Sequence, residues 1–190
     1  MNNELARLLA ELRTDHKNMT LLLDLLETES NRLYEGQDGD YELMADVMRY
    51  MTVYPDAIHH PKEDRIYAEI KVARPDLSVG FDKIVLDHRE LAQLGTKLRT
   101  DIEAIMSGTA LRRNVVVADA LRYIQRLREH MSWEEHDLFI RVEEMIHDGH
   151  DSIVDSELHD NTDPVFGPEV EKRFGKLFDS IQQTLGASHM

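Results

Sequence analysis

The most constraining feature of this sequence is the spacing of its apolar residues, which recur at intervals of three and four along almost the whole chain. This spacing places apolar side chains on one face of an α-helix, whereas alternating β-branched runs between turns are nearly missing. A chain of 190 residues can bury an ordinary hydrophobic core as one domain. The sequence therefore predicts an all-α protein.

Four stretches with this pattern are long enough to be helices of a bundle. They cover about 3–34, 41–73, the stretch from the end of RPDLSVG to 106, and 111–147. Pro55 and Pro61 fall within the second stretch, and because proline removes a backbone donor and bends a helix, they predict a local distortion there. Since short loops join the four helices, we expect an antiparallel, up-down four-helix bundle over residues 1–147.

The C-terminal region, residues 148–190, has a different pattern. It begins with the polar stretch DGHDSIVDSELHDNTDP and continues with PEVEKRFGKLFDSIQQTL, in which apolar residues share one face. This pattern predicts an acidic loop and then an additional C-terminal, amphipathic helix, which packs outside the bundle or against a second subunit. We expect the final GASHM to be a flexible tail and assign no role to His189.

The composition excludes several classes of function. The absence of cysteine rules out disulfides, thiolate metal sites, iron–sulfur ligation and cysteine nucleophiles. The formal net charge of -15 has the same sign as nucleic acids and anionic membranes, so we expect neither as a partner. Acidic residues near the start and no apolar stretch long enough for a signal or a membrane span favour a cytoplasmic protein. We expect a monomer or a homodimer.

Two of the predicted helices carry a histidine and a glutamate four residues apart. The helix at 41–73 contains AIHHPKEDRIY, with His59 and Glu63 at this spacing and His60 three residues before the same glutamate. The helix at 111–147 contains REHMSWEEHDLF, with His130 and Glu134 at this spacing. Residues four apart lie on the same face of a helix, so each helix directs an imidazole and a carboxylate the same way.

The other two helices each carry a histidine on their apolar face. His16 lies among residues of the first helix that should be buried, and His88 lies between Ile84 and Leu91. A lone histidine in such a position is most often a core residue that is hydrogen-bonded to a neighbour. Because inward histidines occur on all four helices together with two glutamates, we interpret the set as a metal site.

The number of candidate ligands suits a pair of ions. The set comprises His16, His59, His60, Glu63, His88, His130 and Glu134. Neutral imidazole suits iron, and a glutamate can span two cations with its two oxygens. If both glutamates bridge two six-coordinate irons and an oxo or hydroxo group does the same, about one position stays open for a small molecule. His60 has two readings, as a ligand or as a residue behind the ligands or at the mouth of the site, because Pro61 makes the local geometry hard to predict.

These motifs resemble the hemerythrin-like, or HHE cation-binding, family, over residues 10 to 140 or so. The resemblance rests on His16, HHPKE at 59–63, His88 and HMSWE at 130–134, and HHPKED is typical of bacterial members. The resemblance implies a non-haem diiron centre in which Glu63 and Glu134 bridge the irons and the histidines are terminal ligands.

The sequence departs from the oxygen-carrying hemerythrins at two points. Those proteins have two histidines four apart in the third helix, whereas Ala92 follows His88 at that distance. They also have an aspartate five residues after the fourth-helix histidine, whereas here Glu134 follows at four. We expect His60 to supply the missing nitrogen, with an open iron position that faces another direction. Sensing or redox turnover is then favoured over reversible oxygen carriage.

The resulting functional hypothesis is a diiron protein that binds or reacts with dioxygen, hydrogen peroxide or nitric oxide in sensing or oxidative-stress defence. Catalase-like turnover of peroxide would make it an enzyme.

Oxygenation of an organic substrate is less favoured, because ferritin-like oxygenases use four carboxylates and two histidines. Iron–sulfur cluster repair belongs to a hemerythrin-like branch that often carries an N-terminal segment with cysteine, which this chain lacks. A metal-regulated interaction module is a further alternative. Nitrogen and oxygen ligands accept several metals, so the sequence does not choose between iron, manganese and a mixed pair.

Overall fold

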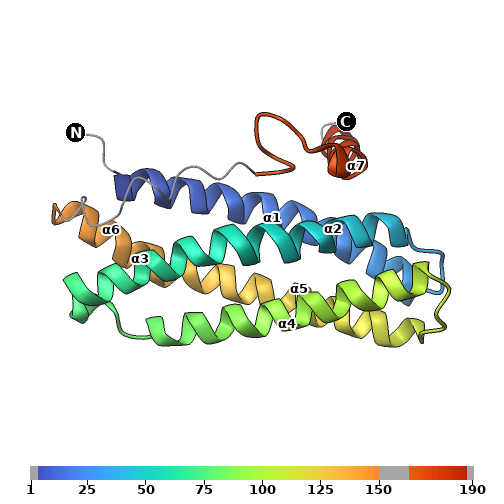
Figure 1. Ribbon diagram of the computed structural model, residues 1–190, viewed down its shortest axis with the longest axis horizontal. Coiled ribbons are helices and arrows are strands. Elements are labelled where there is room, and N and C mark those ends of the chain that lie inside the picture. The colour runs from blue at the N-terminus through green and yellow to red at the C-terminus, as the bar shows by residue number, and fades with distance from the viewer. Residues whose placement is uncertain (1–3, 150–162, 188–190) are drawn as a thin grey trace.

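Four long helical rods lie side by side in the computed structural model, which describes residues 4–149 and 163–187 (Figure 1). Two of the rods contain a π-helical turn, named η1 and η3, in the middle. In chain order the rods are α1 (Glu4–Tyr34); α2 (Tyr41–Tyr54), η1 (Pro55–His59) and α3 (His60–Ala73); α4 (Phe81–Met106); and α5 (Arg113–Trp133), η3 (Glu134–Leu138) and α6 (Phe139–His147). A 3-10 turn, η2 (Pro75–Leu77), connects the second rod to the third.

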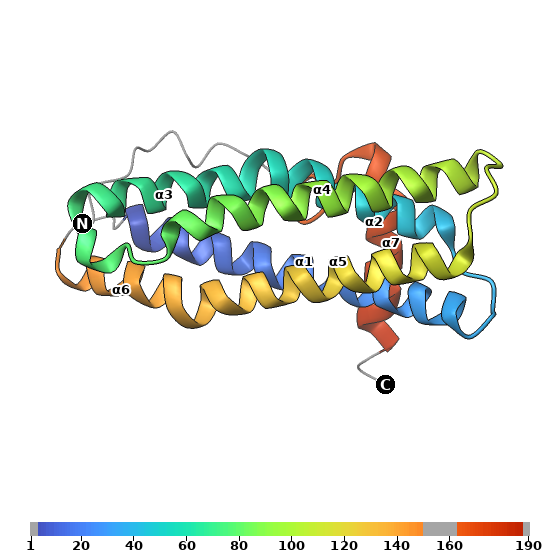
Figure 2. The ribbon, with the colours of Figure 1, turned by 90° about the horizontal axis from the view of Figure 1, so that it is seen from below.

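Successive rods run in opposite directions, so the predicted antiparallel, up-down four-helix bundle is confirmed (Figures 1 and 2). α1 packs against α2 and α5, and α4 packs against the same two helices. Short connections make this possible. Asp40 caps the N-terminus of α2 by accepting a hydrogen bond from the Leu43 N–H at 2.9 Å. Gly80, with φ of 95°, supplies the left-handed conformation immediately before α4.

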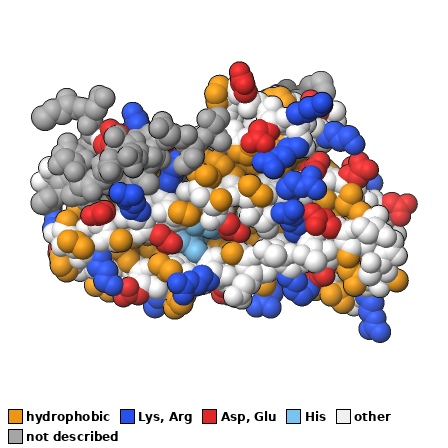
Figure 3. All heavy atoms as spheres, in the orientation of Figure 1, with side chains coloured by type: hydrophobic (Ala, Val, Ile, Leu, Met, Phe, Trp, Pro, Cys, Tyr) orange, Lys and Arg blue, Asp and Glu red, His pale blue; other side chains and the backbone are white. Residues whose placement is uncertain are grey.

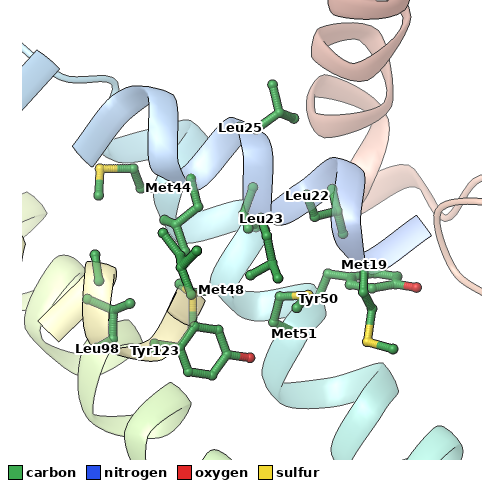
Figure 4. Close-up of a cluster of buried hydrophobic side chains, with 14 of the residues drawn as sticks. Met19, Leu22, Leu23, Leu25, Met44, Met48, Tyr50, Met51, Leu98 and Tyr123 are labelled. Atoms are coloured by element: carbon green, nitrogen blue, oxygen red, sulfur yellow. The ribbon is translucent and has the colours of Figure 1, made fainter. Parts of the chain in front are cut away.

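The apolar core consists of two clusters, one on each side of a polar layer. Figure 4 shows part of the larger cluster, in which leucines of α1 lie next to methionines of α2. The smaller cluster includes Leu8, Ile70, Phe81 and Phe139 at the other end of the rods. In the first three rods the candidate metal ligands fall between the residues of one cluster and those of the other, and in the fourth rod His130 and Glu134 lie where the two clusters meet. The core therefore holds these polar side chains in the middle of the bundle.

The additional C-terminal helix is α7 (Gly175–Ala187), which follows a 3-10 turn, η5 (Lys172–Phe174). It lies across the rods, seen end-on in Figure 1 and lengthwise in Figure 2, and it contacts α1 and α2. Phe174, Leu177 and Ile181 are buried in the larger apolar cluster. Of the two predicted arrangements, the structure has the helix on the outside of its own bundle. Most of the predicted acidic loop, 150–162, and the last residues of the predicted tail lie outside the described residues.

No helix in the described part of the chain is both long enough and apolar enough to cross a bilayer.

Candidate metal centre

All seven residues that the sequence indicated as ligands are buried in the polar layer of the bundle. Their side chains come from all four rods, and none is more than 6% exposed. They are His16 of α1, His59 of η1, His60 and Glu63 of α3, His88 of α4, His130 of α5 and Glu134 of η3. Among the described residues on the face drawn in Figure 3, histidine atoms are visible in one small area near the middle of the molecule.

The two π-helical turns lie at the site itself. η1 ends at His59, and η3 begins at Glu134, four residues after His130. A π-helical turn contains one more residue than an α-helical turn, and it rotates the side chains that follow. The distortion that the prolines predicted in the second rod is confirmed, and Pro55 is the first residue of η1. No proline marks η3, so the distortion of the fourth rod was not predicted.

The carboxylate of Glu63 lies between histidines from three rods. Its Oε1 is 3.3 Å from His59 Nε2 and 3.7 Å from His16 Nε2. Its Oε2 is 3.4 Å from His88 Nε2. The two oxygens of this one residue therefore face different histidines.

Glu134 occupies a similar position on the opposite side. Its Oε2 is 3.2 Å from His130 Nε2 and 3.5 Å from His16 Nε2, and its Oε1 is 3.8 Å from His88 Nε2. Tyr67 donates a long hydrogen bond of 3.4 Å to Oε1. Sequence reasoning missed Tyr67, which looks like any other apolar-face residue of its helix.

The ligand atoms form two groups with the spacing that a metal ion requires. One group is His60, Glu63, His88 and His130, and the other is His16, His59 and Glu63, with the atoms of each within 4.8 Å of one another. Glu63 belongs to both groups. His60 lies with His88 and His130, so the structure brings it to the centre and not to the mouth of the site.

Eight nitrogen and oxygen atoms of this layer are buried without a hydrogen-bond partner. They are Nε2 of His16, His60, His88 and His130, Nδ1 of His130, both oxygens of Glu63, and Oε2 of Glu134. A buried polar atom without a partner costs about 1–3 kcal/mol, so native proteins rarely keep several of them together. Imidazole nitrogens and carboxylate oxygens that converge in this way fit cations, which would give these atoms their partners.

A carboxylate lies behind each of the five imidazoles. The Nδ1 atoms of His16, His59 and His88 are each 3.0 Å from a carboxylate oxygen, of Glu135, Asp15 and Asp64 respectively. The corresponding distance is 3.3 Å from His60 to Asp56. Asp87 lies 3.9 Å from His130 Nδ1, which is too far for a hydrogen bond. A carboxylate that accepts a hydrogen bond from Nδ1–H fixes the tautomer in which Nε2 offers its lone pair to the centre.

Four of these five carboxylates belong to residues that are next to a candidate ligand in the sequence, but each lies beside a histidine of a different rod. Asp15 precedes His16 and contacts His59, for example, and Glu135 follows Glu134 and contacts His16. Asp64 and Glu135 likewise contact His88 and His16. The signal in the sequence that could have identified these four carboxylates is their position beside a candidate ligand.

Burial and charge act in opposite directions on the pKa values of the site. Burial lowers the pKa of His88, but Asp64, Glu134 and Glu63 outweigh burial and raise this pKa to about 11. Burial and Glu63 raise the pKa of Glu134, but His130 and two further histidines lower it to about 2. Burial lowers the pKa of His60 to about 4, although Asp56 opposes this effect. The raised pKa of His88 and the lowered pKa of Glu134 indicate an imidazolium and a carboxylate at the site beside a neutral His60, and a cation would displace the proton of His88.

The remaining histidines and aromatic residues have other surroundings. His136 and His147 are exposed, and His150 and His159 lie outside the described residues. Trp133 packs against the smaller apolar cluster. Tyr54 is buried and donates a hydrogen bond to Asp15.

The family is shown by a direct comparison. A family model described as the hemerythrin HHE cation-binding domain matches residues 7–142, which is most of the chain. The chain therefore belongs to the hemerythrin HHE cation-binding family, which implies metal binding, and the structure has a buried histidine and glutamate cluster that could hold a metal ion. Searches among curated proteins and among solved structures found no match.

Proposed function

We propose that the seven buried residues hold two iron ions and that the loaded protein binds or reacts with a small oxidant. The observation that carries this proposal is the position of Glu63, whose oxygens lie 3.3 Å from Nε2 of one group of histidines and 3.4 Å from Nε2 of the other. A carboxylate between two groups of imidazoles suits two neighbouring cations better than one.

The two groups divide the ligands unequally. His16 and His59 would hold one ion, and His60, His88 and His130 would hold the other. Glu63 belongs to both groups, and Glu134 Oε2 lies 3.5 Å from His16 Nε2 and 3.2 Å from His130 Nε2. Imidazole nitrogen suits iron, and two bridging carboxylates offset part of the charge of the pair. The group of His16 and His59 offers one imidazole fewer than the other group, so an ion held there would have more room for an additional small molecule.

Iron in such a pair, when bound, supplies an exchangeable coordination position and electrons for dioxygen, hydrogen peroxide or nitric oxide. The residues of this chain provide the surroundings. The apolar clusters on both sides limit the access of water, and Phe139 stacks on the ring of His16 at 5.2 Å between centroids. The outer carboxylates keep the imidazoles oriented. Sensing of an oxidant and defence against one both follow from this chemistry.

The test is a metal analysis combined with absorption spectra of the full chain, purified from cells grown with ample iron. We expect about two irons per chain and an oxygen-to-iron charge-transfer band that changes when hydrogen peroxide or oxygen is added. His136→Ala serves as the control, because this histidine is exposed and belongs to neither ligand group. A colourless protein without iron, or one that takes up only manganese, would contradict the proposal.

A further inference from the structure

Two buried tyrosines of α2, Tyr50 and Tyr54, lie in a series of contacts that leads away from the candidate metal site. Their rings lie one helical turn apart and stack, with centroids at 5.5 Å and planes at 26°. The Tyr54 hydroxyl donates to Asp15, at 3.3 Å from Oδ1, and the other oxygen of Asp15 lies 3.0 Å from His59 Nδ1. A continuous series of contacts therefore runs from the Tyr50 ring to a histidine of the site.

The outer end of this series is a second carboxylate. Tyr50 donates a hydrogen bond of 2.7 Å to Asp163 Oδ2 (Tyr50 is labelled in Figure 4), and Oδ1 of Asp163 accepts the backbone N–H groups of Val165 and Phe166 at 2.8 Å each. Burial, with Asp163 adding to its effect, raises the pKa of Tyr50 well above its ordinary value. The phenol is thus neutral at physiological pH. An oxidised phenol is a strong acid, and Asp163 lies where it can take the proton.

A cavity of about 430 Å³ opens beside this series of contacts, and Tyr54 and both carboxylates line it. Its other charged lining residues are Arg7, Glu11 and Lys62. Lys62 is only 5% exposed, and its Nζ is 3.9 Å from the Glu11 carboxylate. Because two cations and three carboxylates nearly balance, the lining suits a neutral, hydrogen-bonding molecule better than an ion. A phenol or a hydroquinone has these properties.

The buried tyrosines of the described chain differ in this respect, since Tyr67 also donates to a carboxylate, that of Glu134 at 3.4 Å, whereas Tyr123 does not. Tyr123 is 3% exposed, and its hydroxyl has no carboxylate hydrogen-bonded to it within the described residues. Tyr50 and Tyr54 each have one.

We propose that Tyr50 and Tyr54 form a redox-active pair that passes single electrons from a phenol- or hydroquinone-type donor in this cavity toward the metal site, with hydrogen peroxide as the oxidant. This inference rests on the proposed function and adds a donor class and a donor site to it. Tyr50 gives up one electron toward the metal site and its O–H proton to Asp163, which leaves a neutral tyrosyl radical and a carboxylic acid.

The donor then restores the pair. One electron passes from the donor through the Tyr54 ring to the Tyr50 radical, Asp163 returns its proton to the phenolate oxygen, and the donor releases a proton. Two such rounds deliver the two electrons and two protons that reduce one hydrogen peroxide to two waters. Two hydroquinones become two semiquinones. Hydrogen peroxide is the only oxidant, and the donor is the only reductant.

The experiment uses the iron-loaded full chain, mixed with hydrogen peroxide and frozen rapidly for electron paramagnetic resonance. We expect a tyrosyl radical signal that disappears when hydroquinone is present. Tyr50→Phe should remove the signal, and Tyr54→Phe and Asp163→Asn should reduce its yield at least about tenfold, which corresponds to about 1.4 kcal/mol. Tyr123→Phe is the matched control and should keep the signal.

Iron content and the peroxide-dependent absorption change are recorded on the same samples, so that the two proposals fail in different ways. If the wild type holds iron and consumes peroxide without a tyrosyl signal, or if Tyr50→Phe and Tyr54→Phe keep the full signal, the tyrosine relay is wrong and the diiron function stands. If the wild type has no iron or does not respond to peroxide, both proposals are wrong.

Discussion

His59 and His60 are consecutive residues, yet their imidazoles belong to different ligand groups, with ring centroids 5.6 Å apart and planes at 67°. In a regular α-helix, consecutive side chains point about 100° apart around the axis, so they rarely share one buried site. The π-helical turn that ends at His59 allows both rings to enter the polar layer. The local shape of one helix thus sets the number of nitrogens at the centre.

Replacement of His60 should therefore remove one ion and not both. His60→Ala takes one of three imidazoles from the group that contains His88 and His130 and leaves the group of His16 and His59 intact. We expect iron content to fall from about two to about one per chain, measured by inductively coupled plasma mass spectrometry. His136→Ala should retain both ions. Full iron content in His60→Ala would place His60 outside the ligand set.

Replacement of Glu63 should lower the iron content more than replacement of His60 does, because Glu63 is the residue that both ligand groups share. Glu63→Gln keeps the size of the side chain but removes the negative charge, and an amide is a poor bridge between two cations. We expect at least about tenfold less bound iron at equal iron supply. Glu144→Gln, at an exposed position, is the matched control. Retention of two ions by the Glu63 variant would argue against a bridging role.

Replacing a carboxylate behind an imidazole should weaken metal affinity without changing the number of ions bound. Asp64 accepts from His88 Nδ1 at 3.0 Å, so Asp64→Asn weakens the orientation of that ring but removes no ligand. We expect two ions at saturation and about 10- to 100-fold weaker binding, measured by competition with a chelator of known affinity. Asp101→Asn, which lies away from the site and pairs with Lys97, should bind as the wild type does. If Asp64→Asn and Asp101→Asn bind iron with equal affinity, Asp64 does not support metal binding by orienting His88.

Binding of metal should release protons. The pKa of His88 is raised from 6.5 to about 11, so in the absence of metal this imidazole is protonated at neutral pH. A metal ion requires the neutral ring, and affinity should therefore rise with pH across the range from 6.5 to 11. Titration calorimetry in two buffers with different ionisation enthalpies measures the released protons. No release at pH 7 would contradict the charge state that the structure indicates.

The same shifts predict how the stability of the metal-free protein depends on pH. The raised pKa of His88 gives stability that is fully present below pH 6.5 and is lost as pH rises through about 11. The lowered pKa of Glu134 gives stability that is present above pH 4.5 and is lost as pH falls through about 2. We therefore expect the free energy of unfolding contributed by His88 and Glu134 to be largest between pH 4.5 and 6.5, measured by urea titration. The lowered pKa of His60 costs stability as pH falls from 6.5 toward about 4, so the contribution of the three groups together should peak near the upper end of that range. A contribution that grows from pH 6.5 toward pH 10 would be inconsistent with these shifts.

The sequence predicted the rods and the ligands well, because both depend on spacing along a helix. The predicted helix at 41–73 agrees with the rod from Tyr41 to Ala73, and all seven candidate ligands meet in one buried layer. The two π-helical turns could not be derived in this way. That the distortion of the second rod is a π-helical turn depends on hydrogen bonding within the rod, and η3 in the fourth rod contains no proline to mark it.

The carboxylates behind the histidines were also beyond the sequence pattern. Asp15 and Asp87 are charged residues beside inward positions, which a pattern of apolar spacing assigns to the surface. Their role depends on which rods are neighbours. Asp15 of α1 contacts His59 of the second rod, and only the packing of those rods brings the two together.

The most direct test of the central claim is a crystal structure of the iron-loaded protein with anomalous diffraction data collected at the iron absorption edge. We predict two anomalous peaks inside the bundle, one next to Nε2 of His16 and His59 and the other next to Nε2 of His60, His88 and His130, with the Glu63 carboxylate between the peaks. A single peak, peaks at the surface, or an empty layer in crystals of iron-replete protein would contradict a diiron centre built from these seven residues.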